Sequence, residues 1–309
     1  MGASGSRTAI AKGVISTLLG AIFWGFSGTC LQYLFSSYQM GSLLLTTIRQ
    51  LGAGIVFCAF LLIRNTDTVV AMLRDTDTAR RLAIFGTFGL FLNSVLYAAT
   101  ISHTNAGTAT VLQSLCIVLA LLVTCVRTPR IPRPLEICAL VSALAAIFLI
   151  ATHADPSSLK LPLAGLVLGL LCACAATFYT MYPRPLFDRW GSLAVTGLGM
   201  LQGGITGLIA CTATGAFAEA PALDANAILV LAITVLIGTC GAYGLFLHGV
   251  SIVGPVAGNM LGAAEPVSAT VISALWLATP FTVSDWLGLA LMVATIFFIA
   301  LQTKQDGAR

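Results

Sequence analysis

The chain has 309 residues, of which 58% are apolar and only 8% carry a charge, and its formal net charge is +4. An ordinary soluble domain carries about 25% charged residues, so a water-soluble core of this size cannot hide so much apolar surface. The composition therefore excludes an ordinary soluble protein and indicates one embedded in lipid. The small positive charge does not point to a nucleic acid partner.

Ten apolar segments are long enough to cross a membrane, which requires about 20 residues of helix. The first is interpreted as an uncleaved span, because it is too long for the apolar region of a secretory signal. Backbone polar groups in lipid must bond within the chain, so we predict an all-α, polytopic membrane protein with ten transmembrane helices. The segments are 13–36, 41–63, 80–101, 106–126, 134–152, 163–183, 192–212, 226–248, 254–277 and 283–302.

Lysine and arginine fall in alternate gaps between these segments, apart from Arg49 and Lys160. Four arginines lie in 64–81, three lie in 127–133, and two lie in 184–189. Short basic loops stay on the cytoplasmic side of a membrane. The pattern therefore predicts a multi-pass protein whose N- and C-termini are both cytoplasmic.

The sequence also repeats weakly at an offset of about 152 residues. Matching pairs include Gly13 and Gly165, Phe26 and Phe178, Gln50 and Gln202, and Gly86 and Gly238. Each half contains five spans, an odd number, so the second half must enter the membrane in the opposite orientation. We therefore predict two inverted five-helix repeats, 1–152 and 153–309. Secondary transporters are built in this way, with the substrate held where the halves meet.

Three short motifs lie within the spans: Ala21-Ile-Phe-Trp24-Gly25 in the first, Arg49 in the second, and Leu261-Gly-Ala-Ala-Glu265-Pro266-Val267 in the ninth. Together with the topology they resemble the EamA family of the drug/metabolite transporter superfamily, over nearly the whole chain. The sequence departs from the family at two places. Ser114-Leu115 stands where the Glu-Pro pair would repeat, and Ala278-Thr279-Pro280 stands where an acidic residue often follows the ninth span.

The resemblance implies a secondary active transporter in a bacterial inner membrane. Its substrates would be amino acids, amines or related small metabolites, often exported, and the mechanism would be alternating access. The scarcity of buried charge argues against a multiply anionic substrate such as a sugar phosphate, which would require several buried cations. The predicted partners are a small-molecule substrate and the lipid bilayer, with a proton as the candidate coupling ion. The sequence does not determine whether the protein forms a homodimer.

Arg49 and Glu265 are the only charged residues clearly inside the apolar segments. A charge at the bilayer centre costs about 2.5–3.5 kcal/mol on insertion scales, so such a residue usually faces a cavity or a partner. Glu265 either contacts a cation or carries a coupling proton, or it forms a hydrogen-bonded pin between close-packed helices. Arg49 keeps its proton, so it is a poor proton carrier. Its guanidinium is expected either to bind a substrate carboxylate, to donate to carbonyls of a neighbouring helix, or to extend along the helix to the membrane interface. For both residues the structural role is the favoured hypothesis, and direct pairing between them stays open.

Amides and phenols at membrane depth need hydrogen-bond partners, so the polar stripes of the third and fourth spans must face protein. These side chains bind either a ligand or one another. Trp24 provides either a cation–π face or a core aromatic. The predicted substrate-binding residues are Trp24, Asn93, Tyr97, Gln113, Tyr179, Tyr243, Asn259 and Glu265.

The sequence supports no metal, cofactor or catalytic site. His103, His153 and His248 fall near the ends of different spans, and Cys172-x-Cys174 has no accompanying histidine. A P-loop is also absent from the sequence, so an ion gradient or exchange would have to drive uphill movement. The alternatives are an intramembrane enzyme, which would need a reactive constellation that the sequence lacks, and a channel, which would need a filter.

Overall fold

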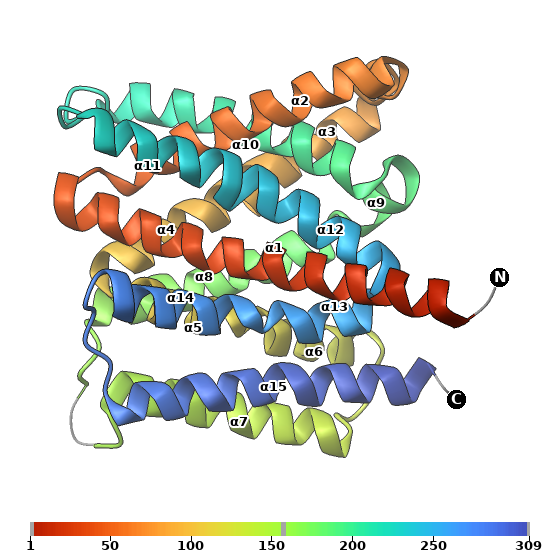
Figure 1. The fold of residues 1–309 in the computed structure, drawn as a ribbon, viewed down its shortest axis with the longest axis vertical. Coiled ribbons are helices and arrows are strands. Elements are labelled where there is room, and N and C mark those ends of the chain that lie inside the picture. The colour runs from red at the N-terminus through yellow and green to blue at the C-terminus, as the bar shows by residue number, and fades with distance from the viewer. Residues whose placement is uncertain (1–2, 156–158, 308–309) are drawn as a thin grey trace.

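The computed structural model describes residues 3–155 and 159–307, and within these residues all regular secondary structure is helical, without a strand. Long apolar segments form helices because a helix satisfies every backbone polar group inside the segment. Figure 1 shows the helices lying side by side in one bundle. The helices are α1 (Ala3–Tyr38), α2 (Ser42–Arg74), α3 (Thr76–Ile84), η1 (Phe85–Phe91), α4 (Leu92–His103), α5 (Ala106–Ser114), α6 (Cys116–Arg127), α7 (Pro134–Thr152), α8 (Leu163–Met181), α9 (Arg184–Trp190), α10 (Ser192–Thr214), α11 (Ala225–Val235), η2 (Leu236–Gly241), α12 (Ala242–Val253), α13 (Pro255–Gly262), α14 (Ala264–Trp276) and α15 (Val283–Gly307).

Within the described ranges, nine helical stretches are long and apolar enough to cross a membrane. The predicted span at 254–277 is not among them, and within its described residues Met260–Trp276 forms a shorter apolar helix. The beginning of α1 and the end of α15 lie at the same end of the bundle, which we call the termini end (Figure 1). The opposite end, where α1 meets α2, is called the far end. The chain is a multi-pass membrane protein.

Two helical stretches are interrupted by a single tight turn. The backbone N–H of Leu115 donates to the carbonyl of Leu112 at 3.2 Å, and that of Ala263 donates to the carbonyl of Met260 at 3.2 Å. A bond to the third preceding residue tightens the helix locally. Irregular backbone at membrane depth is tolerated where it is buried in protein or lines a cavity. The turn at Ala263 lies two residues before Glu265.

Two π-helical turns, η1 and η2, lie within the helical stretches that run from α3 to α4 and from α11 to α12. Each contains two glycines, at Gly86 and Gly89 in η1 and at Gly238 and Gly241 in η2. The two turns are separated by nearly the same offset as the sequence repeat. Such turns are rare and are often found at functional sites.

The most extensive helix contacts join the first half of the chain to the second. Helix α2 packs along α10 and α7 packs along α15, while α1 lies on α12 and α4 lies on α8. Figure 1 shows α7 beside α15 at one edge of the bundle. When each helix is replaced by its equivalent in the other half, α2–α10 and α7–α15 each become themselves, and α1–α12 becomes α8–α4. Two related halves that face each other would give such a pattern.

Glycine allows a close approach between α2 and α10. A Cβ atom added to Gly54 would lie 2.5 Å from the backbone nitrogen of Leu201, and one added to Gly204 would lie 2.7 Å from that of Leu51. Small residues let membrane helices approach in this way and gain dispersion contacts. The α2–α10 pair therefore depends on the absence of side chains at two crossing points.

We expect Gly54→Leu to destabilise the protein by about 1–3 kcal/mol, because the new side chain must push α10 away from α2. The measurement is the midpoint of thermal unfolding in detergent. Gly244→Leu is the matched control, because Gly244 is also helical and a Cβ there meets nothing within 4 Å. Equal midpoints for the two variants would contradict the packing argument.

At the far end, a hydrogen-bond network surrounds the half-buried side chain of Gln32. Its Nε2 donates to Thr279 Oγ1 at 2.8 Å, and its Oε1 accepts from the backbone N–H of Ala106 and from Ser273 Oγ, each at 2.8 Å. These bonds connect α1 to the starts and ends of helices from both halves. Nearer the surface, Tyr38 Oη donates to Asp224 Oδ1 at 2.8 Å and links α1 to the start of α11.

The termini end is also bridged between the halves. Arg189 Nη1 lies 2.7 Å from Asp75 Oδ2, and Trp190 Nε1 donates to Thr78 Oγ1 at 3.1 Å. Thr78 Oγ1 in turn donates to Asp75 at 2.7 Å. This hydrogen bond, together with the Arg189 charge, lowers the pKa of the Asp75 carboxyl. The bridge therefore persists at neutral pH and is lost only as the pH falls below the ordinary range of a carboxyl group.

Candidate functional site

One cavity of about 250 Å³ lies between the two halves of the chain. It is bordered by both kinds of helix irregularity, because Ser114, Cys116 and Gly262 flank the tight turns and Gly238 and Thr239 belong to η2. Its lining also includes Trp24, Arg49, Asn93, Tyr97, Gln113, Tyr179, Tyr243 and Glu265. All predicted site residues whose side chains are described therefore line this one cavity. The side chain of Asn259 lies outside the described residues.

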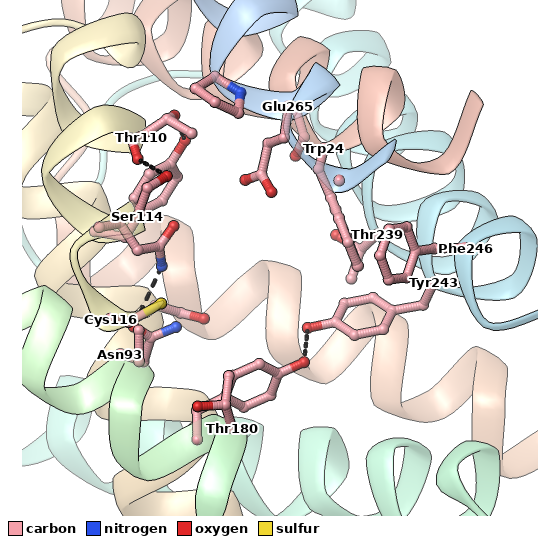
Figure 2. Close-up of a pocket in the computed structure, with 18 of the residues that line it drawn as sticks. Trp24, Asn93, Thr110, Ser114, Cys116, Thr180, Thr239, Tyr243, Phe246 and Glu265 are labelled. Carbon is pink, nitrogen blue, oxygen red and sulfur yellow. Dashed lines mark hydrogen bonds between the residues drawn. The ribbon is translucent and has the colours of Figure 1, made fainter. Parts of the chain in front are cut away.

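The carboxylate of Glu265 points into the open centre of the cavity (Figure 2). It stands across the cavity from Thr180, with Tyr243 and Phe246 on one side and Ser114 on the other. Among the residues that the structure describes, no hydrogen bond or ion pair to this carboxylate is found. The hydrogen-bonded pin predicted as its structural role is therefore not present here. A carboxylate at this depth needs a partner, and the cavity can supply water, a proton or a cation.

An aromatic wall forms one side of the cavity. The rings of Trp24 and Tyr243 meet edge to face with centroids 4.9 Å apart, and Trp24 and Phe246 lie 4.7 Å apart. The hydroxyl groups of Tyr179 and Tyr243 are hydrogen-bonded at 3.0 Å, which connects α8 to α12. Aromatic faces of this kind bind apolar groups and attract cations.

The opposite wall is polar, and its members bind one another. Gln113 Nε2 donates to Asn93 Oδ1 at 3.3 Å, and the hydroxyls of Tyr97 and Thr110 are hydrogen-bonded at 2.8 Å. Cys172 Sγ also donates weakly to Asn93 Oδ1 at 3.6 Å. These contacts connect α4 to α5 and α8. The polar side chains of Asn93 and Tyr97 in the third span, and of Thr110 and Gln113 in the fourth, therefore face protein and line the cavity.

Arg49 reaches the cavity from α2 and is partly buried. Within the described part of the chain, its guanidinium forms no ion pair with Glu265 and no hydrogen bond to a carbonyl. Direct pairing and the holding of a neighbouring helix, both left open by the sequence, therefore find no support. The cavity presents one cation and one anion that are not paired with each other.

Several lining residues were not predicted from the sequence, and they include Ser27, Gln50, Ser94, Thr180, Met200 and Phe246. Gln50 had a usable signal, because a carboxamide inside an apolar span needs partners as much as Asn93 does. No sequence feature marked Met200 and Phe246 as lining residues, because apolar side chains are common throughout membrane spans. No group of three or more metal-binding side chains occurs within the described ranges.

The sequence profile of the EamA-like transporter family matches residues 11–152 and 163–301. The chain belongs to the EamA-like transporter family. Membership confirms the resemblance carried by Trp24-Gly25, Arg49 and the Glu265-Pro266-Val267 motif.

This EamA-like protein is similar to two bacterial transporters and to one protein of known structure. The uncharacterized inner membrane transporter YicL of Salmonella typhimurium (strain LT2) is 34% identical over 296 residues, which cover 95% of this chain and 97% of that protein. The uncharacterized transporter YwfM of Bacillus subtilis (strain 168) is 34% identical over 71 residues, covering 23% of this chain and 24% of YwfM. A protein of known crystal structure aligns over 94% of this chain and 97% of its own, with a TM-score of 0.62 and 19% identity. That likeness shows a shared fold.

Proposed function

We propose that this protein is a secondary active transporter that moves amino acids, amines or related small metabolites by alternating access, in the export direction. The observation that carries the proposal is the cavity between the halves. It lies within a membrane bundle, it is bordered by interrupted helices, and its lining includes one carboxylate and one guanidinium for which the described residues supply no hydrogen bond or ion pair. Broken helices around a central site are the usual construction of secondary transporters. Membership of a transporter family supports the same function.

The proposed architecture is two inverted five-helix repeats, 1–152 and 153–309, in a bacterial inner membrane. In this arrangement α13 and α14 together make one further crossing, which gives ten. The packing pairs that survive exchange of the halves support it, as do the matched π-helical turns. The arginine-rich gap at 64–81 supports a cytoplasmic termini end. The inner membrane relative YicL supports the location.

The charges of the cavity favour a small zwitterion or a small cation. Glu265 attracts an ammonium group, the ring of Trp24 offers it a cation–π face, and Arg49 accepts a carboxylate. A cavity of about 250 Å³ suits a molecule the size of an amino acid. A sugar phosphate would need more than the single cation that lines this space.

Uptake of labelled amino acids and amines into proteoliposomes that contain the protein tests the proposal. We expect saturable uptake that is accelerated by unlabelled substrate on the opposite side, because a carrier exposes its site to one face at a time. Chemical conversion of the substrate without its movement across the membrane would show that the protein is an enzyme and not a carrier. Uptake that never saturates would replace it with a channel.

Cysteine labelling in intact cells tests the inverted architecture. Single cysteines introduced within 64–81 and within 213–225 should react from opposite faces of the membrane. Reaction of both from the same face would overturn the inverted repeats and the carrier mechanism with them.

A further inference from the structure

Two phenol groups share one hydrogen bond at the edge of the cavity. The hydroxyl oxygens of Tyr179 and Tyr243 lie 3.0 Å apart, and both side chains line the cavity and are only partly buried. Figure 2 shows the ring of Tyr243 extending toward the open centre, below Glu265 in that view, with the hydroxyl at its leading end. The polar atoms of this pair therefore border the space that a ligand would fill.

A pair of phenols always has one donor left over. Each hydroxyl has a single O–H donor. One hydroxyl donates to the other, so the accepting hydroxyl still has its own proton to donate. Within the described parts of the chain, neither hydroxyl forms a second hydrogen bond. Whichever of Tyr179 and Tyr243 accepts, one O–H group is therefore free to donate to an acceptor in the cavity.

The surroundings of the two rings indicate which hydroxyl donates to a ligand. The guanidinium of Arg49 lines the cavity and is an electrostatic neighbour of the Tyr243 phenol. The ring of Tyr179 is stacked on Phe85, with centroids 5.9 Å apart, and Phe85 is fully buried. Tyr179 is therefore held on the protein side of the pair and Tyr243 on the ligand side. The O–H of Tyr179 donates to Tyr243, and that of Tyr243 is left for the ligand.

The groups around Tyr243 favour an anionic acceptor. Arg49 attracts negative charge, and a neutral O–H group adds a hydrogen bond to the same anion. A carboxylate has two oxygens and about four lone-pair sites, so it can accept from a guanidinium and a phenol together. Glu265 repels a carboxylate, which directs the negative end of a zwitterion away from Glu265 and toward Tyr243.

We propose that the Tyr243 hydroxyl donates a hydrogen bond to the carboxylate of the transported molecule, and that Tyr179 is a positioning residue that donates to Tyr243 in turn. The inference rests on the proposed function and adds to it a residue that selects carboxylate-bearing ligands over simple amines. Hydrogen bonds in a chain polarise one another, so Tyr179 strengthens the contact without touching the ligand. The contact should favour a carboxylate by about 10- to 100-fold.

Binding of L-leucine, and of isoamylamine as the analogue without a carboxylate, to the purified full-length protein tests the proposal. Ligand-induced thermal stabilisation gives each affinity. Tyr243→Phe removes the hydroxyl and keeps the ring. It should weaken L-leucine binding by about 10- to 100-fold and change isoamylamine binding by about threefold or less. Tyr179→Phe leaves the Tyr243 donor in place, so it should weaken L-leucine binding by only about two- to fivefold.

Tyr182→Phe is the matched control, because Tyr182 is a partly buried phenol of the same segment that does not line the cavity. It should bind both compounds as the wild type does. A loss of L-leucine binding in Tyr179→Phe that equals or exceeds the loss in Tyr243→Phe would overturn the proposal. Equal weakening of both compounds by Tyr243→Phe would also overturn it, because a residue that only supports the fold gives that result.

The wild-type protein provides a test that does not depend on the variants. L-leucine should bind at least about 10-fold more tightly than isoamylamine. Equal affinity for the two compounds would overturn the proposal even if Tyr243→Phe does not fold. Saturable uptake of both compounds without this difference would leave the carrier function standing while the role of Tyr243 falls.

Discussion

The Glu265→Gln protein is expected to exchange substrate across the membrane but to lose accumulation driven by a proton gradient. Glu265 is the acidic side chain that faces the cavity, and it has no partner among the described residues. A carboxylate can take up a proton on one face and release it on the other, whereas a carboxamide cannot. One charge moved through 100 mV supplies about 2.3 kcal/mol, which corresponds to about 50-fold accumulation. The variant should lose this accumulation in proteoliposomes with an imposed gradient.

Asp67→Asn is the control for this experiment, because Asp67 is an exposed acid of α2 outside the cavity. It should accumulate substrate as the wild type does. Undiminished accumulation by Glu265→Gln would show that the proton travels elsewhere or that another ion drives transport. Loss of folded protein in that variant, judged by gel filtration, would instead show that Glu265 is a structural residue.

Arg49→Met is expected to separate two classes of substrate. Among the described lining residues Arg49 is the cation, and its guanidinium, which has no hydrogen-bond partner among them, can bind a carboxylate in two parallel hydrogen bonds. Loss of one partner from a buried charged pair costs about 2–5 kcal/mol, so transport of L-leucine should fall by at least about 30-fold. Transport of isoamylamine, which has no carboxylate, should change little. The ratio of kcat/KM for the two compounds is the measurement.

Arg49→Lys makes this comparison sharper. Lysine keeps the positive charge but loses the planar fork that matches a carboxylate, so it should restore L-leucine transport only in part. Equal loss of both substrates in Arg49→Met would contradict a contact with the carboxylate. It would indicate that Arg49 supports the helices around it.

The inward-facing polar residues could be predicted because membrane physics leaves them few alternatives. Asn93 and Gln113 cannot face lipid, so their stripes had to face protein, and they are found hydrogen-bonded beside the cavity. The same reasoning applied to the second span would have found Gln50. The charged pair Arg49 and Glu265 was predictable on the same grounds, although their positions relative to each other were not.

Local backbone geometry and close packing could not be read from the sequence. Apart from Glu265, the segment 254–277 is mostly apolar, so its composition predicts one span and does not reveal the tight turn at Ala263, between α13 and α14. Nothing in the sequence marks the approach of Gly54 to Leu201, because glycine is common in membrane helices. Contacts between the halves depend on how two distant surfaces meet, and periodicity along one helix carries no information about that.

The bridges at the two ends of the bundle bear on the direction of net flow. Arg189 and Asp75 meet at the termini end and Tyr38 and Asp224 at the far end, and both pairs are accessible to water. Hydrogen bonds and ion pairs in such positions exchange readily with water and stabilise a conformation only slightly. These two exposed bridges therefore favour neither end strongly, whereas the half-buried Gln32 network adds hydrogen bonds at the far end alone. In the proposed alternating-access mechanism, the gradients of the solute and of the driving ion set the direction of net flow, so the proposed export requires a gradient that drives the solute out of the cell.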